Sequence, residues 1–522
     1  MTDHHPTDLP GTPPTTPNLP LEDDRRPDPG SRGMAKVAWI ALIVLVATVA
    51  YLQQGKAASS AAEKPAQAVI QPEPGSPIAM MARLMTRLMI GLREMDRESA
   101  GGKATSNTPQ ITEAMKGAVN DLDKTAKSAP EILRAAIVAA ELLGAEEGTN
   151  RLAILEAKLK PNELEGMDAA IKLPEEQRDQ LLADIAAVRA RLSGATVEPA
   201  AEDALVQRHG WFGRLNAAYD KPASDRLRAK ILSESYAVII AMVVLLIGFV
   251  GVAFASFVCS IIWIVRITTR ERYPQFVAPA PGGSVYLETV AAFVGVFLLF
   301  QLGLGVVEGL VAGGGTAPEW FGKVHLAGQW LVLPVIFYPL LRGVSWSQWK
   351  ADLGWNTGRG VFREIGSGIF HYFAGLPLLL LGAIISLIAA SIHQLVTGSK
   401  DEGVNNPILD LVGGSDMLTI VLLYVLATVW APIVEETIFR GAMFRHLRSR
   451  MVAALAAVVS ALVFGVMHGY QWFMLMPVIS LGFIFALMRE RRDSLIGPVF
   501  THAMHNGTVM LVLITMLSLM GE

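Results

Sequence analysis

Long apolar stretches recur along most of this chain, separated by polar turns. A helix needs roughly 17–25 apolar residues to cross a bilayer, and nine stretches are near or above that length, although the one at 325–341 is among the shortest and could be re-entrant. They occupy residues 35–53, 237–265, 285–312, 325–341, 365–392, 417–439, 452–468, 472–488 and 494–518. The pattern predicts an all-α, polytopic transmembrane bundle of about eight or nine spans.

The polar segments predict how the rest of the chain is organised. Residues 1–33 are rich in Pro, Thr and Asp, which is typical of a disordered tail. The first span, 35–53, follows too long a polar region for a signal peptide, so we expect a retained anchor. After it, residues 54–236 are polar enough to form a helical domain. The remaining chain divides into transmembrane helices at 237–412 and a C-terminal core at 413–518.

Within the 54–236 domain, the period of apolar residues predicts helices at 128–143, 149–159, 174–192 and 201–218. A further stripe comprises Met81, Leu84, Met85, Leu88, Met89, Leu92 and Met95. Its three- and four-residue spacing predicts a helix whose apolar face packs in a core. A methionine-based metal site is a much weaker interpretation, because sulfur-rich stripes usually serve packing.

Basic residues concentrate in five places between or beside the spans. They are Arg25, Arg26, Arg32 and Lys36; Arg266, Arg270 and Arg272; Arg342, Lys350, Arg359 and Arg363; Arg440, Arg445, Arg448 and Arg450; and Arg489, Arg491 and Arg492. With nine spans and a cytoplasmic N-terminus, all five clusters fall on the cytoplasmic side, as the positive-inside rule requires. This orientation places the 54–236 domain outside the cell.

Composition agrees with a multi-pass protein of the cell membrane. Of 522 residues, 52% are hydrophobic and only 17% are charged, and the mean hydropathy is +0.40, whereas soluble proteins carry about a quarter charged residues. The net charge of −3 does not favour nucleic acid as a partner. A single cysteine, Cys259, excludes a disulfide framework within the chain.

Three short patterns near the C-terminus place ionisable and amide side chains in or beside apolar spans. They are Glu435-Glu436-x-x-x-Arg440, Phe464-x-x-x-His468 and His502-x-x-x-Asn506. Such residues are costly in hydrocarbon, so they indicate a functional site. Each pattern spaces its polar or aromatic residues four apart, which puts them on one helix face.

The depths of the patterns allow them to meet. Glu435 and His468 lie roughly 22 and 27 Å along their helices from the turn near Arg450. His502 and Asn506 lie roughly 16 and 22 Å along the last helix from the turn near Arg491. All four residues therefore fall in one depth band.

The residue types suggest hydrolysis. A carboxylate beside an imidazole, Glu435 with His468, can deprotonate water and then protonate a leaving amine. A second imidazole with an amide, His502 with Asn506, can donate hydrogen bonds to an oxyanion. The same Glu and His set could instead ligate a divalent metal such as zinc, although a His-Glu-x-x-His helix is absent from the patterns. We favour water activated without an obligatory metal.

Structural roles compete with these interpretations. Glu436 and Arg440 are spaced to pair with each other, so they could mainly support the site. His468 alone could be an interfacial histidine, and Asn506 could be a contact between helices. We give His505 a minority chance of a direct role, and we expect His446 to be solvated in the basic turn.

Together the three patterns resemble the CPBP family, the CAAX proteases and bacteriocin-processing enzymes also called the Abi family. The resemblance covers about 416–517, and the one departure is an extra apolar span, 472–488, between the second and third motifs. It implies an α-helical intramembrane endopeptidase with Glu435 and His468 acting on water, His502 and Asn506 forming the oxyanion site, and Glu436 and Arg440 in support. Members are often called metalloproteases, and relatives act on prenylated proteins, peptides or membrane proteins.

Two other functions are open at this point. Some members of the family serve as non-proteolytic scaffolds, so the chain could be a membrane scaffold or sensor that binds an extracytoplasmic partner through residues 77–236. A transporter is weaker, because the chain has neither inverted repeats nor paired broken helices.

Overall fold

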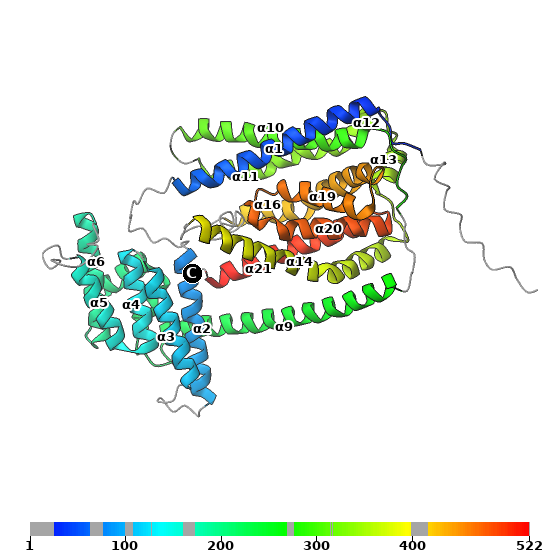
Figure 1. The fold of residues 1–522 in the computed structure, drawn as a ribbon. Coiled ribbons are helices and arrows are strands. Elements are labelled where there is room, and N and C mark those ends of the chain that lie inside the picture. The colour runs from blue at the N-terminus through cyan, green and yellow to red at the C-terminus, as the bar shows by residue number, and fades with distance from the viewer. Residues whose placement is uncertain are drawn as a thin grey trace, which may run out of the picture. The chain divides into compact units, whose positions relative to one another are not determined.

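The computed structural model describes residues 26–62, 77–99, 108–126, 128–159, 173–268, 276–313, 315, 317–397 and 416–520. Apart from one isolated bridge between Pro27 and Ala280, the regular structure of these residues is entirely helical (Figure 1). The helices of the N-terminal half are α1 (Arg32–Ala62), α2 (Pro77–Ser99), α3 (Pro109–Thr125), α4 (Ala129–Leu143), α5 (Ala145–Leu159), α6 (Glu175–Leu192), α7 (Pro199–His209), α8 (Trp211–Ala217) and α9 (Arg226–Thr268). The middle of the chain forms α10 (Val285–Ala312), α11 (Glu319–Gly328), the 3-10 helix η2 (Gln329–Phe337), α12 (Tyr338–Leu341), α13 (Trp346–Leu353) and α14 (Val361–Thr397). The C-terminal part forms α16 (Met417–Val425), α17 (Ala431–Glu435), α18 (Phe444–Arg448), α19 (Ala453–Val466), α20 (Met476–Arg492) and α21 (Ile496–Met520), with π-helices η3 (Leu426–Trp430) and η4 (Glu436–Met443) and the 3-10 helix η5 (Trp472–Met474).

Seven of the described helices are long and apolar enough to cross a membrane. They are Arg32–Leu52, Arg226–Arg266, Val285–Ala312, Trp320–Leu341, Val361–Thr397, Met417–Arg448 and Ile496–Ser518. The predicted all-α, polytopic membrane architecture is confirmed. The other two expected spans form the shorter helices α19, with 14 residues, and α20, with 17. A charged run from Arg489 to Arg492 ends the apolar part of α20.

The segment expected to be possibly re-entrant, 325–341, lies in a continuous helical stretch. Nine of its residues form the 3-10 helix η2, with Pro334 inside it. A 3-10 helix rises about 2.0 Å per residue, more than the 1.5 Å of an α-helix. The tighter winding therefore lengthens a segment that is short for a span.

The chain divides into two compact units. The first comprises residues 1–61, 255–403 and 421–507, and the second comprises 62–254, 404–420 and 508–522. All the residues of the three sequence patterns belong to the first unit.

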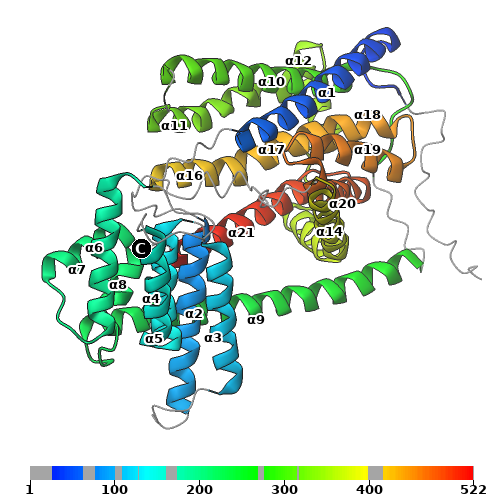
Figure 2. The same cartoon turned by 60° about the vertical axis from the view of Figure 1, so that its left-hand side comes forward.

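Close helix contacts hold the first unit together around α20, which packs against both α14 and α19 (Figure 2). A Cβ added at Gly382 of α14 would lie 2.5 Å from the Ser480 hydroxyl of α20 and 2.8 Å from the Met476 carbonyl. At Gly482 of α20 it would lie 3.1 Å from Ala461 of α19. Small residues thus allow the backbones to approach closely, as is common between membrane helices.

The basic turns of the first unit meet at one end of its helices through ion pairs. Arg448 Nε lies 2.8 Å from Glu490 Oε2, and Arg492 Nη2 lies 2.6 Å from Glu364 Oε1. Arg445 Nη2 lies 2.8 Å from Asp28 Oδ1, and Asp28 is 7% exposed. Residues 26–31 therefore pack against the protein, although they belong to the segment expected to be disordered. Residues 1–25 of that segment lie outside the described residues, and so do residues 63–76 of the expected 54–236 domain.

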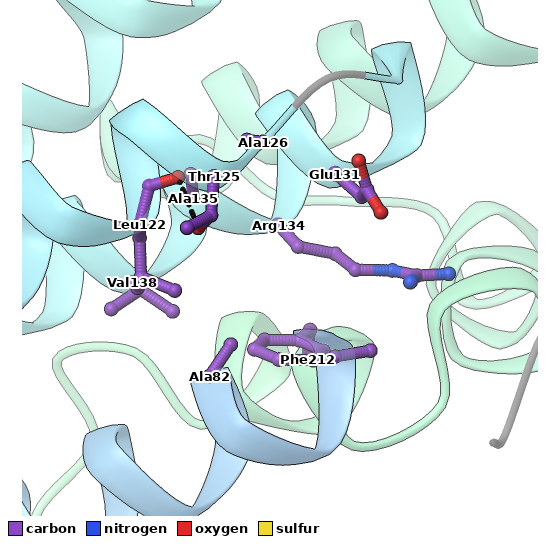
Figure 3. A pocket seen from close by; sticks show the side chains of 10 residues that line it. Ala82, Leu122, Thr125, Ala126, Glu131, Arg134, Ala135, Val138 and Phe212 are labelled. Atoms are coloured by element: carbon purple, nitrogen blue, oxygen red, sulfur yellow. Dashed lines mark hydrogen bonds between the residues drawn. The ribbon is translucent and has the colours of Figure 1, made fainter. Parts of the chain in front are cut away.

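The second unit contains helices α2–α8 and the first part of α9 around their own core, which includes Leu133, Leu152, Leu181, Trp211 and Leu215. The expected helix at 201–218 is two helices, because Gly210 takes a left-handed φ of 53° between α7 and α8. A small hollow of about 20 Å³ in this unit has room for a water molecule or two. Small and apolar side chains line it, and Arg134 and Glu131 lie at one side (Figure 3).

The stripe on α2 that was expected to pack in a core does so only in part: Leu88, Met89 and Leu92 belong to the core of this unit or pack against it. Met89 is 6% exposed, but Met81 and Met95 are 57% and 46% exposed. The buried face of α2 instead carries arginines with acidic partners: Arg87 Nη2 lies 2.9 Å from Glu234 Oε2, and Arg93 pairs with Glu141. These ion pairs join residues far apart in sequence, and they occupy part of the face that the apolar period assigned to the core.

Candidate active site

One long helical segment, from α16 to α18, carries the first motif (Figure 2). Two π-helical stretches, η3 and η4, lie on either side of the short helix α17, which ends at Glu435. π-Helical turns hold one extra residue and occur frequently at functional sites. Here they set the directions in which the adjacent carboxylates Glu435 and Glu436 leave the helix.

Pro432 explains how Asn506 is positioned. In η3 the Ala431 N–H donates to the Leu426 carbonyl, five residues back. The next donor in this register would be residue 432, but proline has no N–H. The Ala427 carbonyl is therefore left without that partner, and it accepts a 2.8 Å hydrogen bond from Asn506 Nδ2 of α21.

Three side chains from three helices converge on one point. Glu435 Oε2 lies 3.9 Å from His468 Nε2 and also 3.9 Å from His502 Nε2. That oxygen is buried and has no hydrogen-bond partner among the described residues. The motifs on α17, after α19 and on α21 therefore contribute to a single cluster, and His502 lies as near to Glu435 as His468 does.

The tautomer of His468 follows from its other nitrogen. His468 Nδ1 lies 2.8 Å from the Phe464 carbonyl, which can only accept a hydrogen bond. Nδ1 must therefore carry a proton. In a neutral ring this leaves the lone pair on Nε2, facing Glu435.

His502 is oriented by the supporting pair. Its Nδ1 lies 2.8 Å from Glu436 Oε1, and the same oxygen accepts a 3.0 Å hydrogen bond from Arg440 Nη1. The i, i+4 pair of Glu436 and Arg440 expected from the spacing is thus present, and both side chains are fully buried. A carboxylate on one ring nitrogen fixes the orientation of the other, which for His502 points toward Glu435.

Aromatic rings enclose the Arg440 guanidinium. Its Cζ lies 4.1 Å from the ring centre of Phe464 and 5.3 Å from that of Phe485. Phe485 also stacks on His502, with ring centres 5.3 Å apart and 28° between the planes. Cation–π contacts stabilise a desolvated cation. Phe464 stood in the sequence pattern without a role, whereas Phe485 had no sequence signal, because its position depends on how α20 packs.

Other histidines and carboxylates are placed outside this cluster. His505 Nδ1 lies 2.8 Å from the Tyr372 hydroxyl. His446 is 1% exposed and its ring lies against Trp39, so the expectation that it is solvated is wrong. His446 lies on α18, and its contact with Trp39 of α1 joins residues too far apart in the sequence to be predicted from it. Glu288 pairs with Arg342 at 3.0 Å.

The residue types around Glu435 match those of a zinc site with one carboxylate and two imidazoles. The described residues nevertheless contain no group of three His, Cys, Asp or Glu side chains arranged to hold a metal ion. The residues present therefore do not fit a bound metal as they are placed.

Comparison with known proteins agrees with the motifs. Residues 417–508 match the family described as Type II CAAX prenyl endopeptidase Rce1-like. That range contains all three motifs and the whole cluster. The resemblance to CPBP-family proteases that the motifs predicted is confirmed over this segment.

A bacterial relative extends the similarity beyond this segment. "Putative membrane peptidase YdiL" of Bacillus subtilis (strain 168) is 28% identical over 228 residues, which cover 42% of this chain and 83% of that protein. No solved structure matches the chain. At the level of the family, these similarities support a membrane protease.

Proposed function

We propose that this protein is an intramembrane endopeptidase in which Glu435 and His468 activate the attacking water. One observation carries the proposal: a buried carboxylate oxygen without a partner among the described residues lies 3.9 Å from an imidazole nitrogen that presents a lone pair. A water about 2.8 Å from each atom fits beside both of them. Such a water donates one hydrogen to Glu435 and the other to His468 Nε2.

Hydrolysis then follows from this arrangement. As the water oxygen attacks the carbonyl carbon of the peptide bond, its proton passes to the Glu435–His468 pair. When the C–N bond breaks, the same proton passes to the leaving amine. General base and general acid catalysis of this kind contributes about 10²–10⁴ in rate.

His502 and Asn506 are the proposed donors to the oxyanion. Asn506 Nδ2 has two hydrogens, and the Ala427 carbonyl takes one of them, so the second is available. His502 can donate from Nε2 only when both of its nitrogens carry protons. Glu435 and Glu436 bring two negative charges and Arg440 one positive charge, so an imidazolium at His502 makes the buried cluster neutral. Neutrality matters because unbalanced charge is costly in a dry site.

The proposed substrate is a membrane-embedded or membrane-adjacent peptide or protein. Glu435 and His502 lie on helices long and apolar enough to cross the lipid bilayer, so the scissile bond must be presented within or beside it. We do not expect nucleic acid to be a partner in this function.

The test compares membranes of cells that carry wild-type protein, Glu435→Ala or His468→Ala. Uncleaved substrate should accumulate in both variants. Glu308→Ala is the matched control, because Glu308 is an exposed carboxylate of the span Val285–Ala312 outside the cluster. Normal processing in both site variants would refute the proposal.

A chelator separates this mechanism from the metal-dependent alternative. Purified protein treated with 1,10-phenanthroline should keep its activity, and metal analysis should show no stoichiometric zinc. Loss of activity that zinc restores would instead establish a metalloprotease.

The alternative function is a non-catalytic scaffold or sensor with an extracytoplasmic partner. The exposed methionines Met81, Met85 and Met95 on α2 favour such a contact, because methionine-rich surfaces accommodate partners. If both site variants behave normally while replacing these three methionines by Gln abolishes the phenotype, the scaffold function is correct.

A further inference from the structure

The basic end of the first unit defines which side of the site faces the cytoplasm. Arg445, Arg448 and Arg492 form ion pairs at this end with Asp28, Glu490 and Glu364, so turns far apart in sequence share one surface. Clustered Arg and Lys beside membrane helices mark the cytoplasmic face. The site lies further along the same helices: Glu435 precedes Arg445 by ten residues, about 15 Å of helix.

Between the basic end and the site, the protein is tightly packed. Every residue from Glu436 to Phe444 is buried. Phe464, Phe485 and Arg489, from α19 and α20, are at most 2% exposed. A layer of large side chains thus separates the cluster from the cytoplasmic end.

On the other side of the site, exposure rises. The side chains of Glu435 and His468 are 17% and 27% exposed. Beyond them, Tyr424 is 40% and Trp472 is 56% exposed. On α21, Thr501 and His502 are buried, and residues 503–509 are half-buried or exposed. Exposure therefore increases beyond the site on several helices.

The α19–α20 hairpin is too short to cover this side. The 14 residues of α19 rise about 21 Å, against a hydrocarbon thickness of about 30 Å. The turn after α19 therefore ends short of the far membrane surface. It carries Tyr470, whose ring lies parallel to that of His468 with centres 6.4 Å apart, and then Gln471 and Trp472. Tyr and Trp are the residue types of a membrane–water interface.

We propose that the site receives its substrate from the extracytoplasmic side, through the opening bordered by Tyr424 and the 469–472 turn. The substrate class is a polypeptide segment that leaves the bilayer on the extracytoplasmic face. A cytoplasmic tail would have to pass the buried layer of Arg440, Phe464 and Phe485. This inference rests on the proposed function for the reaction, and on the packing of the first unit for the direction of entry.

Cysteine labelling in intact cells tests the direction. The tests use full-length protein carrying Cys259→Ser. Gln471→Cys probes the turn at the opening, and Ser347→Cys probes the exposed first turn of α13 at the basic end. A membrane-impermeant maleimide is applied before or after permeabilisation, and the mass shift of the protein is read on a gel. Trp472→Cys is a second probe of the opening, in case Gln471→Cys is not produced.

We expect the opening probe to shift in intact cells and Ser347→Cys to shift only after permeabilisation. A shift of the opening probe only after permeabilisation overturns the proposal, and so does the absence of any shift under both conditions. Labelling does not depend on proteolysis. Failure of the peptidase function, seen as normal processing by Glu435→Ala, is thus distinguished from failure of the direction.

Discussion

The proposed role of each site histidine follows from what its Nδ1 atom contacts. Nδ1 of His468 lies against the Phe464 backbone carbonyl, and Nδ1 of His502 lies against the Glu436 carboxylate. The two rings therefore differ in charge environment: His502 lies between two carboxylates, whereas His468 has only Glu435 nearby. This difference is the physical reason for assigning proton acceptance to His468 and donation to His502.

Removing the second oxyanion donor should slow the chemical step. Asn506→Ala loses both the hydrogen bond to the Ala427 carbonyl and the free N–H. Loss of one such donor typically lowers kcat by about 10²–10³, and KM should change little. Kinetics on purified protein would show the split; an unchanged kcat would remove Asn506 from the site.

The aromatic enclosure of Arg440 makes Phe464 a positioning residue. Phe464→Leu keeps the backbone carbonyl that holds His468 but loses the ring 4.1 Å from the guanidinium, a contact of about 0.5–2 kcal/mol. We expect slower processing at near-normal protein levels, with activity kept by Phe464→Tyr.

The control for this prediction is Phe297→Leu, whose ring stacks on Phe293 and not on a cation. Processing assays and thermal unfolding in detergent would separate the two effects. Equal activity in Phe464→Leu and Phe297→Leu would contradict the positioning role.

At the level of single residues, sequence reasoning found those with unusual chemistry for a membrane. Glu435, His468, His502 and Asn506 were visible because polar groups in hydrocarbon are costly. Phe485 and the Ala427 carbonyl were not visible, since apolar residues and backbone atoms gain a role only from packing. His446 was misjudged for the same reason.

At the scale of elements, the π-helical stretches around α17 are the feature that sets the site. Apolar periodicity predicted a span at 417–439, but it could not show a change of helical register inside that span. Likewise, α19 and α20 appeared in the sequence as two spans, yet their lengths make a short hairpin.

Replacing Pro432 by alanine tests the role of the helix register. Pro432→Ala restores an N–H that can bond the Ala427 carbonyl in competition with Asn506. Proline inside a helix costs about 3 kcal/mol relative to alanine. The variant should therefore unfold at a higher temperature but process substrate more slowly. Unchanged or faster processing would show that the freed carbonyl does not position Asn506.

At the scale of the whole molecule, two units with separate cores share one chain. The second unit contains a buried ion-pair group in which His209 Nε2 lies 3.0 Å from Asp184 Oδ2 and Arg208 Nε donates to the same oxygen at 2.9 Å. Burial lowers the pKa of His209. Burial opposes ionisation of Asp184, but hydrogen bonds from His209 and Arg208 outweigh it and lower the pKa of the carboxyl.

Both shifts predict that acid destabilises this unit. Below about pH 6.5, the unfolded chain binds a proton at His209 that the folded unit does not. The stability of the folded unit therefore decreases as the pH is lowered. The stability contributed by Asp184 is lost only at lower pH, as its lowered pKa is approached. Thermal unfolding of full-length protein should therefore show a larger loss between pH 7 and 5.5 than in His209→Gln. Identical losses would contradict this origin.

Reconstituted protein provides the most direct test of the central claim. Membranes from a Glu435→Ala strain hold the accumulated substrate, and purified full-length protein in liposomes can be fused with them. Wild-type and Glu308→Ala protein should release new peptide termini, while Glu435→Ala and His468→Ala protein should not. Release of the same termini by Glu435→Ala protein would contradict the claim that Glu435 activates the water.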